Sequence, residues 1–143
     1  MSTPELRPFH LAIPVDDLAR SRAFYGDLMG CPEGRSSERW VDFDFFGHQL
    51  VIHEVARAQQ GPAGHNPVDG EQVPVPHFGV VLTMEAWEQL RDRLVGAGVE
   101  FQIPPTVRFP GELGEQATMF FYDPAGNALE FKAMRDPSAL FAK

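Results

Sequence analysis

An internal repeat constrains the fold of this chain more than any other feature of its sequence. Residues 9–15 (FHLAIPV) predict a strand, and residues 16–30 predict a helix that begins at a pair of aspartates and ends at a glycine. The same order returns later, where residues 77–82 (HFGVVL) predict a strand and residues 83–98 predict a helix that begins at a threonine. We therefore expect two similar structural modules.

Each predicted helix is followed by further strands. In the first half, residues 40–46 alternate between apolar and acidic side chains, and a glycine connects them to a strand at 49–55. In the second half, strands at 117–122 and 127–134 flank the tetrapeptide DPAG at 123–126. This tetrapeptide predicts a hairpin turn, because proline presets φ and glycine accepts a positive φ. Each half is thus a strand, a helix, and two or three more strands.

The composition is that of one globular domain, since the chain has 143 residues, of which 43% are hydrophobic and 22% are charged. Residues 56–76 and 104–116 are rich in glycine, proline and polar side chains without periodicity. We expect irregular structure in both, either covering a cavity or serving as plain surface connectors. The single domain, 1–143, then divides into module one at about 8–55, the connector 56–76, and module two at about 77–135.

The charge and the apolar patterning exclude several partners. Twelve Lys and Arg residues against twenty Asp and Glu residues leave a net charge of −8, which disfavours binding to nucleic acid. No apolar run approaches the ~18 residues of a membrane span, and residues 1–8 lack an apolar signal region. The one cysteine, Cys31, cannot form an intrachain disulfide. We expect a soluble, cytoplasmic protein that acts on a small molecule.

The repeat also pairs ionisable residues. His10 and His77 occupy the same place in the first strand of each half, and Glu130 in the last strand of the second half has His53 as its counterpart. If the halves pack about a pseudo-twofold axis, all four converge on one point. Two imidazoles and a carboxylate leave open positions for a catalytic Fe(II), Mn(II) or similar divalent ion. Taken singly, each has a plainer interpretation as a hydrogen-bonded or solvated strand residue.

Together these features resemble the vicinal oxygen chelate superfamily, which includes glyoxalase I, type I extradiol dioxygenases, fosfomycin-resistance enzymes and bleomycin-resistance proteins. The resemblance rests on the doubled unit, on the histidine in the first strand of each half, and on the segment 123–130 (DPAGNALE), and it covers about residues 8–134. A narrower similarity, to a bacterial group of predicted extradiol-type dioxygenases, rests on residues 9–15, 40–47, 76–81 and 114–118.

The resemblance implies an α+β fold in which two βαβββ modules form a curved mixed-sheet cleft with helices outside. It implies His10, His77 and Glu130 as metal ligands, and it puts His53 at the position of a fourth ligand that is a glutamate in glyoxalases. The implied cofactor is a divalent metal ion, with Fe(II) favoured and Mn, Ni or Zn as alternatives. A homodimer is also implied, with the site either within one chain or between exchanged modules.

Further roles follow from the same resemblance. The acid–base group would be His65, Tyr122 or Glu115. A tyrosine that assists catalysis in extradiol enzymes corresponds by alignment to Phe120, and Tyr122 shares the face of Phe120 on the strand. Arg35, Arg39 and Arg108 are candidates to neutralise an anionic substrate, or else are solvated arginines. Phe43, Phe45, Phe120 and Phe121 suggest an apolar wall, or else ordinary core.

Three functions remain open. The favoured one is a metal-dependent enzyme of the extradiol-dioxygenase type that acts on a small vicinal-oxygen or aromatic compound. The second is a glyoxalase-like lyase or isomerase, or a thiol transferase, that works without O2. The third is a metal-free protein that sequesters a ligand, as bleomycin-resistance proteins do; the presence of His10, His77 and Glu130 argues against it. Coordination by His53 would favour the second function over the first.

Overall fold

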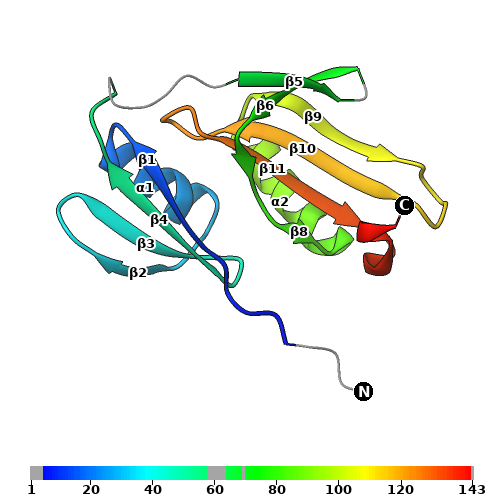
Figure 1. The fold of residues 1–143 in the computed structure, drawn as a ribbon, viewed down its shortest axis with the longest axis horizontal. Coiled ribbons are helices and arrows are strands. Elements are labelled where there is room, and N and C mark those ends of the chain that lie inside the picture. The colour runs from blue at the N-terminus through cyan, green and yellow to red at the C-terminus, as the bar shows by residue number, and fades with distance from the viewer. Residues whose placement is uncertain (1–4, 58–63, 69, 143) are drawn as a thin grey trace. The chain divides into compact units, whose positions relative to one another are not determined.

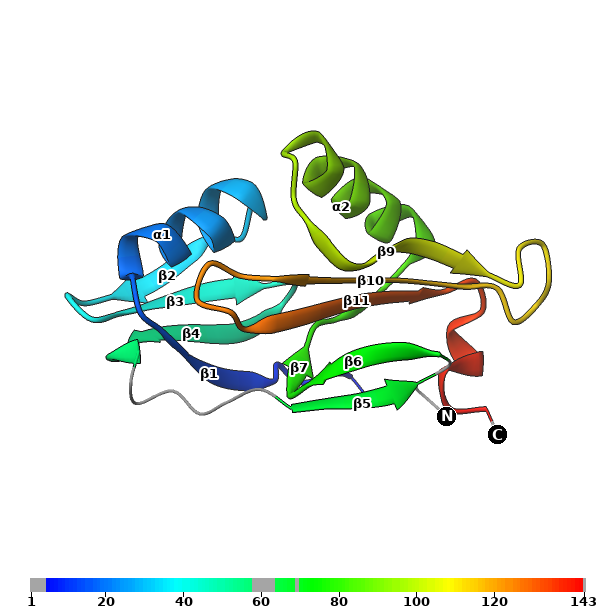
Figure 2. The same cartoon turned by 90° about the horizontal axis from the view of Figure 1, so that it is seen from above.

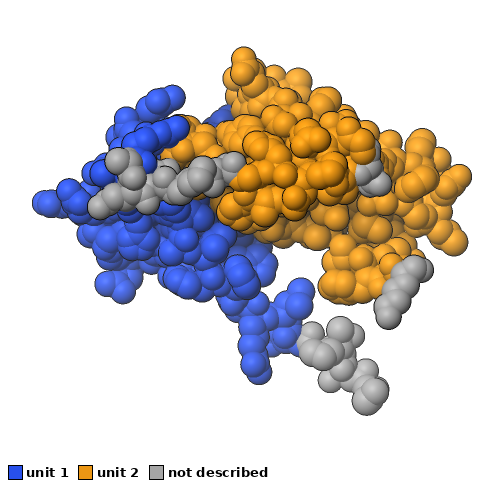
Figure 3. Space-filling model, turned by 45° about the horizontal axis from the view of Figure 1, so that its top comes forward, with its two compact units in different colours: residues 1–60 blue, residues 61–143 orange. Residues whose placement is uncertain are grey.

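The computed structural model describes residues 5–57, 64–68 and 70–142. The chain folds into two compact units, residues 1–60 and residues 61–143 (Figure 3). Each unit carries one copy of the repeat as a strand, a helix and three further strands, so the expected α+β class with two βαβββ modules is confirmed (Figure 1). None of the helices in the described part of the chain is long and apolar enough to span a membrane.

Unit 1 is a four-stranded mixed sheet with helical turns packed against it. The strand order is β1-β4-β3-β2, in which β1 runs parallel to β4 and the other pairs are antiparallel. Tyr25 links the helical segment to the sheet, because its ring lies 5.8 Å from that of Phe43 and 6.4 Å from that of Phe45. The elements are β1 (His10–Val15), α1 (Leu18–Ala23), a π-helical turn (Phe24–Leu28), β2 (Glu33–Ser36), β3 (Trp40–Phe45) and β4 (His48–Glu54).

The helix of unit 1 is shorter than the sequence pattern predicts. It begins after Asp17, whose side chain accepts a hydrogen bond from the backbone N–H of Arg20, as expected for an N-cap. From Phe24 onward the backbone widens into a π-helical turn, in which the N–H of Met29 donates to the carbonyl of Phe24 at 3.0 Å. The consecutive aromatic side chains of Phe24 and Tyr25 are both buried in this turn.

Unit 2 contains a second mixed sheet and a separate hairpin. The strand order is β7-β11-β10-β9, and both β7 and β8 run parallel to β11. Helix α2 covers one face of this sheet, and the β5–β6 hairpin lies on its other side (Figure 2). The elements are β5 (Gly64–Val68), β6 (Glu71–Val75), β7 (His77–Phe78), β8 (Val81–Leu82), α2 (Met84–Gly96), β9 (Phe101–Arg108), β10 (Gln116–Tyr122), β11 (Ala128–Met134) and a 3₁₀ turn (Pro137–Phe141).

Helix α2 matches its sequence signals closely. The side chain of Thr83 accepts a hydrogen bond from the N–H of Ala86, which caps the helix. Trp87 lies on the buried face of α2, and its indole N–H donates to the carbonyl of Phe131 on β11 at 2.9 Å. Leu90 and Leu94 continue this buried face. The apolar side of α2 therefore packs on the central strand of the sheet.

Four of the described strands were not predicted or fall where irregular structure was expected. The β5–β6 hairpin lies within the connector 56–76, of which residues 58–63 and 69 are outside the described part, and β9 extends into the segment 104–116. Strand β2 also lacked a prediction. Both β2 and β9 are edge strands, and β9 contains Pro104 and Pro105. Proline is tolerated at an edge because its missing N–H costs no ladder hydrogen bond there, so the proline-rich pattern resembles a loop.

The strand predicted at 77–82 is divided into β7 and β8. Gly79 lies between them, and a Cβ atom added there would overlap the carbonyl oxygen of Glu130 on β11. The backbones therefore approach so closely at this point that only glycine fits. This approach sets the position of Glu130 beside β7 and β8.

Candidate functional site

The sheet of unit 2 presents two charged side chains on the face opposite α2. Along β11 the burial alternates, so that Leu129, Phe131 and Ala133 are fully buried while Glu130 and Lys132 are only half-buried. Because successive side chains of a strand point to opposite faces, Glu130 and Lys132 share the face that α2 does not cover.

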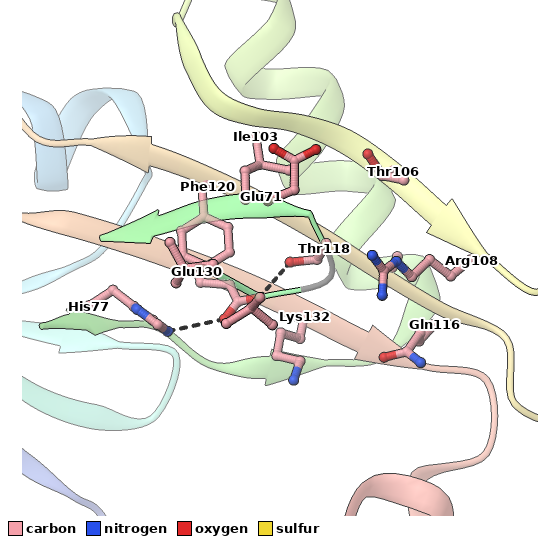
Figure 4. Close-up of a pocket in the computed structure, with 13 residues that line it drawn as sticks. Glu71, His77, Ile103, Thr106, Arg108, Gln116, Thr118, Phe120, Glu130 and Lys132 are labelled. Atoms are coloured by element: carbon pink, nitrogen blue, oxygen red, sulfur yellow. Dashed lines mark hydrogen bonds and ion pairs between the residues drawn. The ribbon is translucent and has the colours of Figure 1, made fainter. Parts of the chain in front are cut away.

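A pocket of about 330 Å³ lies on this face (Figure 4). Its lining comes from β9, β10, β11 and β7, together with Val68, Glu71 and Val73 from the β5–β6 hairpin. Val73 also forms a buried apolar cluster with Ile103 of β9 and Phe120 of β10. The connector hairpin thus helps to enclose the pocket, which agrees with the expectation that a connector covers a cavity.

The imidazole of His77 is held in one tautomer by the backbone. Its Nδ1 lies 2.7 Å from the carbonyl oxygen of Pro74. A carbonyl oxygen only accepts hydrogen bonds, so Nδ1 carries the proton and donates. In the neutral ring the lone pair is then on Nε2, which lies 3.2 Å from Oε1 of Glu130. The side chain of His77 is 30% exposed and that of Glu130 is 16% exposed.

The carboxylate of Glu130 is oriented by a second neighbour. Thr118 on β10 donates its hydroxyl hydrogen to Oε2 at 2.6 Å, which leaves Oε1 facing His77 (Figure 4). A neutral imidazole lone pair and a carboxylate oxygen do not attract each other at 3.2 Å. With a proton on Nε2 the two groups form an ion pair, and without one both atoms are acceptors that could hold a cation between them. The donor set, with a partner behind each ligand atom, fits a divalent metal ion.

Phe120 closes the apolar side of the pocket. Its ring contacts that of His77 edge-on, with 4.9 Å between the ring centroids and an angle of 74°. Phe120 therefore forms part of a wall beside the imidazole, as the sequence suggested. The other three aromatics proposed for such a wall, Phe43, Phe45 and Phe121, are buried in the cores of their units.

His10, in unit 1, is held in the same tautomer by a side chain, Gln49, rather than by the backbone. Its Nδ1 lies 2.8 Å from Oε1 of Gln49, and Nε2 of Gln49 donates to Oδ2 of Asp42 at 3.3 Å. An ionised carboxylate only accepts, so the amide nitrogen of Gln49 faces Asp42 and its carbonyl faces His10. Nδ1 of His10 is therefore the donor, and Nε2 keeps the lone pair that a metal ion would need.

The sheet register corrects the proposed match between His53 and Glu130. In unit 2, His77 pairs with Ala128, and Glu130 lies two residues further along β11. In unit 1, His10 pairs with Gln49, so the residue two positions further is Val51, which is buried. His53 pairs instead with Pro14, about 13 Å further along the strand than His10. His53 is exposed, and in register it is not the counterpart of Glu130.

The three proposed acid–base residues lie elsewhere. His65 is exposed on β5, Tyr122 is half-buried on β10, and Glu115 accepts a hydrogen bond from the N–H of Gly111. None of the three is among the described residues that line the pocket, and their acid–base roles stay predictions. Likewise, no three His, Cys, Asp or Glu side chains are grouped as metal ligands within the described residues, so His77 and Glu130 are the predicted ligands that unit 2 brings together.

The predicted arginines separate into two groups. Arg108 lines the pocket, whereas Arg35 and Arg39 belong to unit 1, where the Arg35 guanidinium lies 5.7 Å from the ring centroid of Trp40. Sequence reasoning did not identify Lys132, which also lines the pocket. Alternation along the last strand is the signal that places Lys132 on the same face as Glu130. The roles of Thr118, Gln49, Asp42 and the Pro74 carbonyl had no such local signal.

Comparison with known proteins gives a consistent picture. The chain matches the family model of the glyoxalase/bleomycin resistance protein/dioxygenase superfamily over residues 7–131. A solved glyoxalase/bleomycin resistance protein/dioxygenase from Alicyclobacillus acidocaldarius is 32% identical, with a TM-score of 0.75, and the alignment covers 94% of this chain and 96% of that chain. No curated protein matches significantly.

Two further solved structures show the same fold at lower identity. The fosfomycin resistance protein FosX from Listeria monocytogenes is 22% identical with a TM-score of 0.63, and the alignment covers 92% of this chain and 94% of that chain. Lactoylglutathione lyase from Agrobacterium tumefaciens is 21% identical with a TM-score of 0.65, and the alignment covers 99% of this chain and 100% of that chain. At these identities the likeness concerns the fold alone.

Proposed function

The chain belongs to the glyoxalase/bleomycin resistance protein/dioxygenase superfamily, and from this premise we propose that it is a divalent-metal-dependent enzyme. The substrate we propose is a small compound with two neighbouring oxygen atoms, and the favoured reaction is of the extradiol-dioxygenase type, with Fe(II) as the metal. When bound, a divalent ion supplies a Lewis acid for the substrate oxygens, and Fe(II) also supplies a site for O2.

The observation that carries this proposal is the pairing of His77 with Glu130 at the edge of a pocket. Nε2 of His77 and Oε1 of Glu130 are both acceptor atoms in the neutral-imidazole form, and they lie 3.2 Å apart. We propose these two atoms as ligands and His10 as the third, through its Nε2. The register in unit 1 supports a set of three ligands without His53. Three protein ligands leave positions for two substrate oxygens, which favours the dioxygenase type over a four-ligand glyoxalase-like centre.

The surrounding residues prepare the pocket for this chemistry. The Pro74 carbonyl and the Thr118 hydroxyl restrict the imidazole and the carboxylate, so that the ligand atoms need little rearrangement on binding. Phe120, Ile103 and Val73 provide an apolar side that excludes water from one part of the pocket. A flat or apolar portion of the substrate would lie against them.

The test is metal content, measured by mass spectrometry on protein purified without oxygen. We compare the wild type with His77→Ala and Glu130→Gln, and we use His53→Ala as the matched control because His53 is an exposed histidine outside the proposed ligand set. Near-stoichiometric iron that is lost in the first two variants and kept in the control would support the proposal. Oxygen uptake with catechols would then test the reaction.

Other outcomes would redirect the proposal. Nickel, zinc or manganese lost in the same two variants would keep the ligands but favour a glyoxalase-like or thiol-transfer reaction without O2. If the wild type holds no metal and takes up none of Fe(II), Mn(II), Ni(II) or Zn(II), the enzyme proposal fails and a ligand-sequestering protein remains. Metal loss in the His53→Ala control would contradict the three-ligand set.

We also propose a homodimer. The support is the resemblance described above, which implies a dimer with the site either within one chain or between exchanged modules of two chains. Light scattering coupled to size-exclusion chromatography measures the mass directly. A mass near that of a single chain at micromolar concentration would contradict this assembly.

A further inference from the structure

We propose that the pocket of unit 2 has an anion-binding end formed by Lys132 and Arg108, so that the substrate carries a carboxylate or phosphate group in addition to its two neighbouring oxygens. This inference rests on the proposed function for its choice of substrate, but the anion site itself is defined by the pocket and can be tested without metal.

The first support is the position of Lys132. It lies on the central strand β11, where it pairs with Val81 of β8 on one side and with Thr118 of β10 on the other. Lysine is almost never fully buried without a partner, and Lys132 is half-buried at this position, so its amine is partly withdrawn from solvent. No carboxylate of the described residues lies within ion-pair distance of its amine. Lys132 is therefore a cation that lines the pocket without an ion-pair partner among the described residues.

The nearest acidic neighbour in sequence does not supply that counterion. Glu130 is two residues away on the same face, but its Oε2 accepts the hydrogen bond of Thr118 and its Oε1 faces Nε2 of His77. Both oxygens are thus directed toward other groups (Figure 4). Glu130 therefore leaves the charge of Lys132 available for a ligand.

The second support is the order of side chains along the pocket. The row of Glu130 contains Phe120 and Ile103, the next row contains Lys132, Thr118 and Thr106, and the row beyond that contains Gln116 and Arg108. Successive rows on one face are two residues apart, or about 7 Å. The pocket therefore changes from metal-ligand and apolar groups at one end to hydroxyl, amide and cationic groups at the other, as Figure 4 shows.

The charge of the pocket points in the same direction. Among the described residues, the lining contains two cations, Lys132 and Arg108, and two carboxylates, Glu130 and the exposed Glu71 of β6. These formal charges cancel without a metal ion, and a divalent cation at Glu130 makes the pocket net positive. In a chain with a net charge of −8, a positive pocket selects an anionic substrate and attracts it from solution. The rows of Glu130 and Lys132 lie about 7 Å apart along the sheet, a spacing that suits a small aromatic or aliphatic acid.

The experiment uses three probes of similar shape: benzoate, phenyl phosphate and the uncharged benzamide. Binding is followed by NMR chemical-shift titration at low salt in the wild type, Lys132→Met, Arg108→Gln and Arg91→Gln. Arg91 is the matched control because it lies on α2, pairs with Asp92 and is outside the pocket, so its loss changes the net charge equally. We expect Lys132→Met to weaken binding of the anions by about tenfold or more, because a charge-assisted hydrogen bond is lost. Benzamide binding should change little.

The outcomes separate this inference from the proposed metal chemistry. Anion binding that persists in His77→Ala shows that the subsite stands even if the metal proposal fails. A preference for benzoate or for phenyl phosphate identifies the anion, and either supports the subsite. Equal weakening in Arg91→Gln, or anions that bind the wild type no better than benzamide, would overturn it. If Lys132→Met does not fold, Lys132→Arg should retain anion binding, and loss of binding in that folded variant also overturns the inference.

Discussion

Replacement of Gly79 by alanine should damage the stability of unit 2 and the candidate site together. Gly79 lies between β7 and β8, where a Cβ atom would overlap the carbonyl oxygen of Glu130 and lie 2.6 Å from its carbonyl carbon. Both atoms belong to the backbone of the central strand β11, so no side-chain rotation relieves the overlap. Strands β7 and β8 must move away from β11, and this movement displaces His77 of β7.

The magnitude follows from the kind of atoms involved. Overpacking against side chains costs about 1–3 kcal/mol, and an overlap with backbone belongs at or above the upper end of this range. We therefore expect the free energy of unfolding to fall by at least about 3 kcal/mol. At about 4 °C per kcal/mol for a chain of this length, Tm should fall by about 12 °C.

The assay is thermal unfolding followed by circular dichroism, combined with metal uptake of the folded fraction at low temperature. Gly96→Ala is the matched control, because a Cβ at this helical position meets nothing within 4 Å. Alanine there should stabilise the protein by about 0.5–1 kcal/mol. A Gly79→Ala protein that melts within a few degrees of the wild type and keeps its metal uptake would refute the argument.

Three smaller perturbations test the contacts described above. Thr118→Val removes the hydrogen bond that orients the candidate carboxylate, and metal affinity measured by competitive titration should fall about 10- to 100-fold; unchanged affinity would contradict that role. Gln49→Leu should let the proton of the neutral His10 ring redistribute between its two nitrogens, which ¹⁵N NMR of the metal-free protein reports directly. An unchanged tautomer would contradict the role of the Gln49 hydrogen bond. The side-chain hydrogen bond from Arg22 lowers the pKa of Glu33, so Arg22→Ala should raise this pKa in an NMR titration. Because the folded pKa is the lower one, the stabilisation is present above the unfolded pKa and is lost as the pH falls through the folded value; a stability difference between variant and wild type that persists in acid would contradict this sign.

Local sequence signals were sufficient where the structure depends on nearby residues. The cap at Thr83 and the apolar spacing that follows it predicted α2, because a helix is stabilised by contacts within a few residues of each other. The turn at 123–126 was predicted for the same reason. Its geometry is held by Asp123, whose Oδ1 accepts from the N–H groups of Ala125 and Asn127.

Edge strands could not be recognised in this way. A central strand such as β10 pairs with a neighbouring strand on each side, and most of its residues are apolar. An edge strand such as β9 forms backbone hydrogen bonds with only one neighbouring strand. Pro104 and Pro105, which lack a backbone N–H, are therefore tolerated there. Its local pattern then has nothing that distinguishes it from a loop, and only the pairing with β10 reveals it.

The sequence by itself determined that the chain is a doubled βαβββ protein of the glyoxalase/bleomycin resistance protein/dioxygenase superfamily. It also singled out His10, His77, His53 and Glu130 as candidate ligands, because a repeat makes equivalent positions visible without any knowledge of contacts. Tertiary structure alone decided which side chains face each other. Strand register, a property of two strands rather than one, separated His53 from the equivalent of Glu130 and aligned Val51 there instead. Register and hydrogen bonding also brought Thr118 to the carboxylate and placed Lys132 in the pocket. Pairing between distant segments is set by the packing of the whole sheet, which no local pattern encodes.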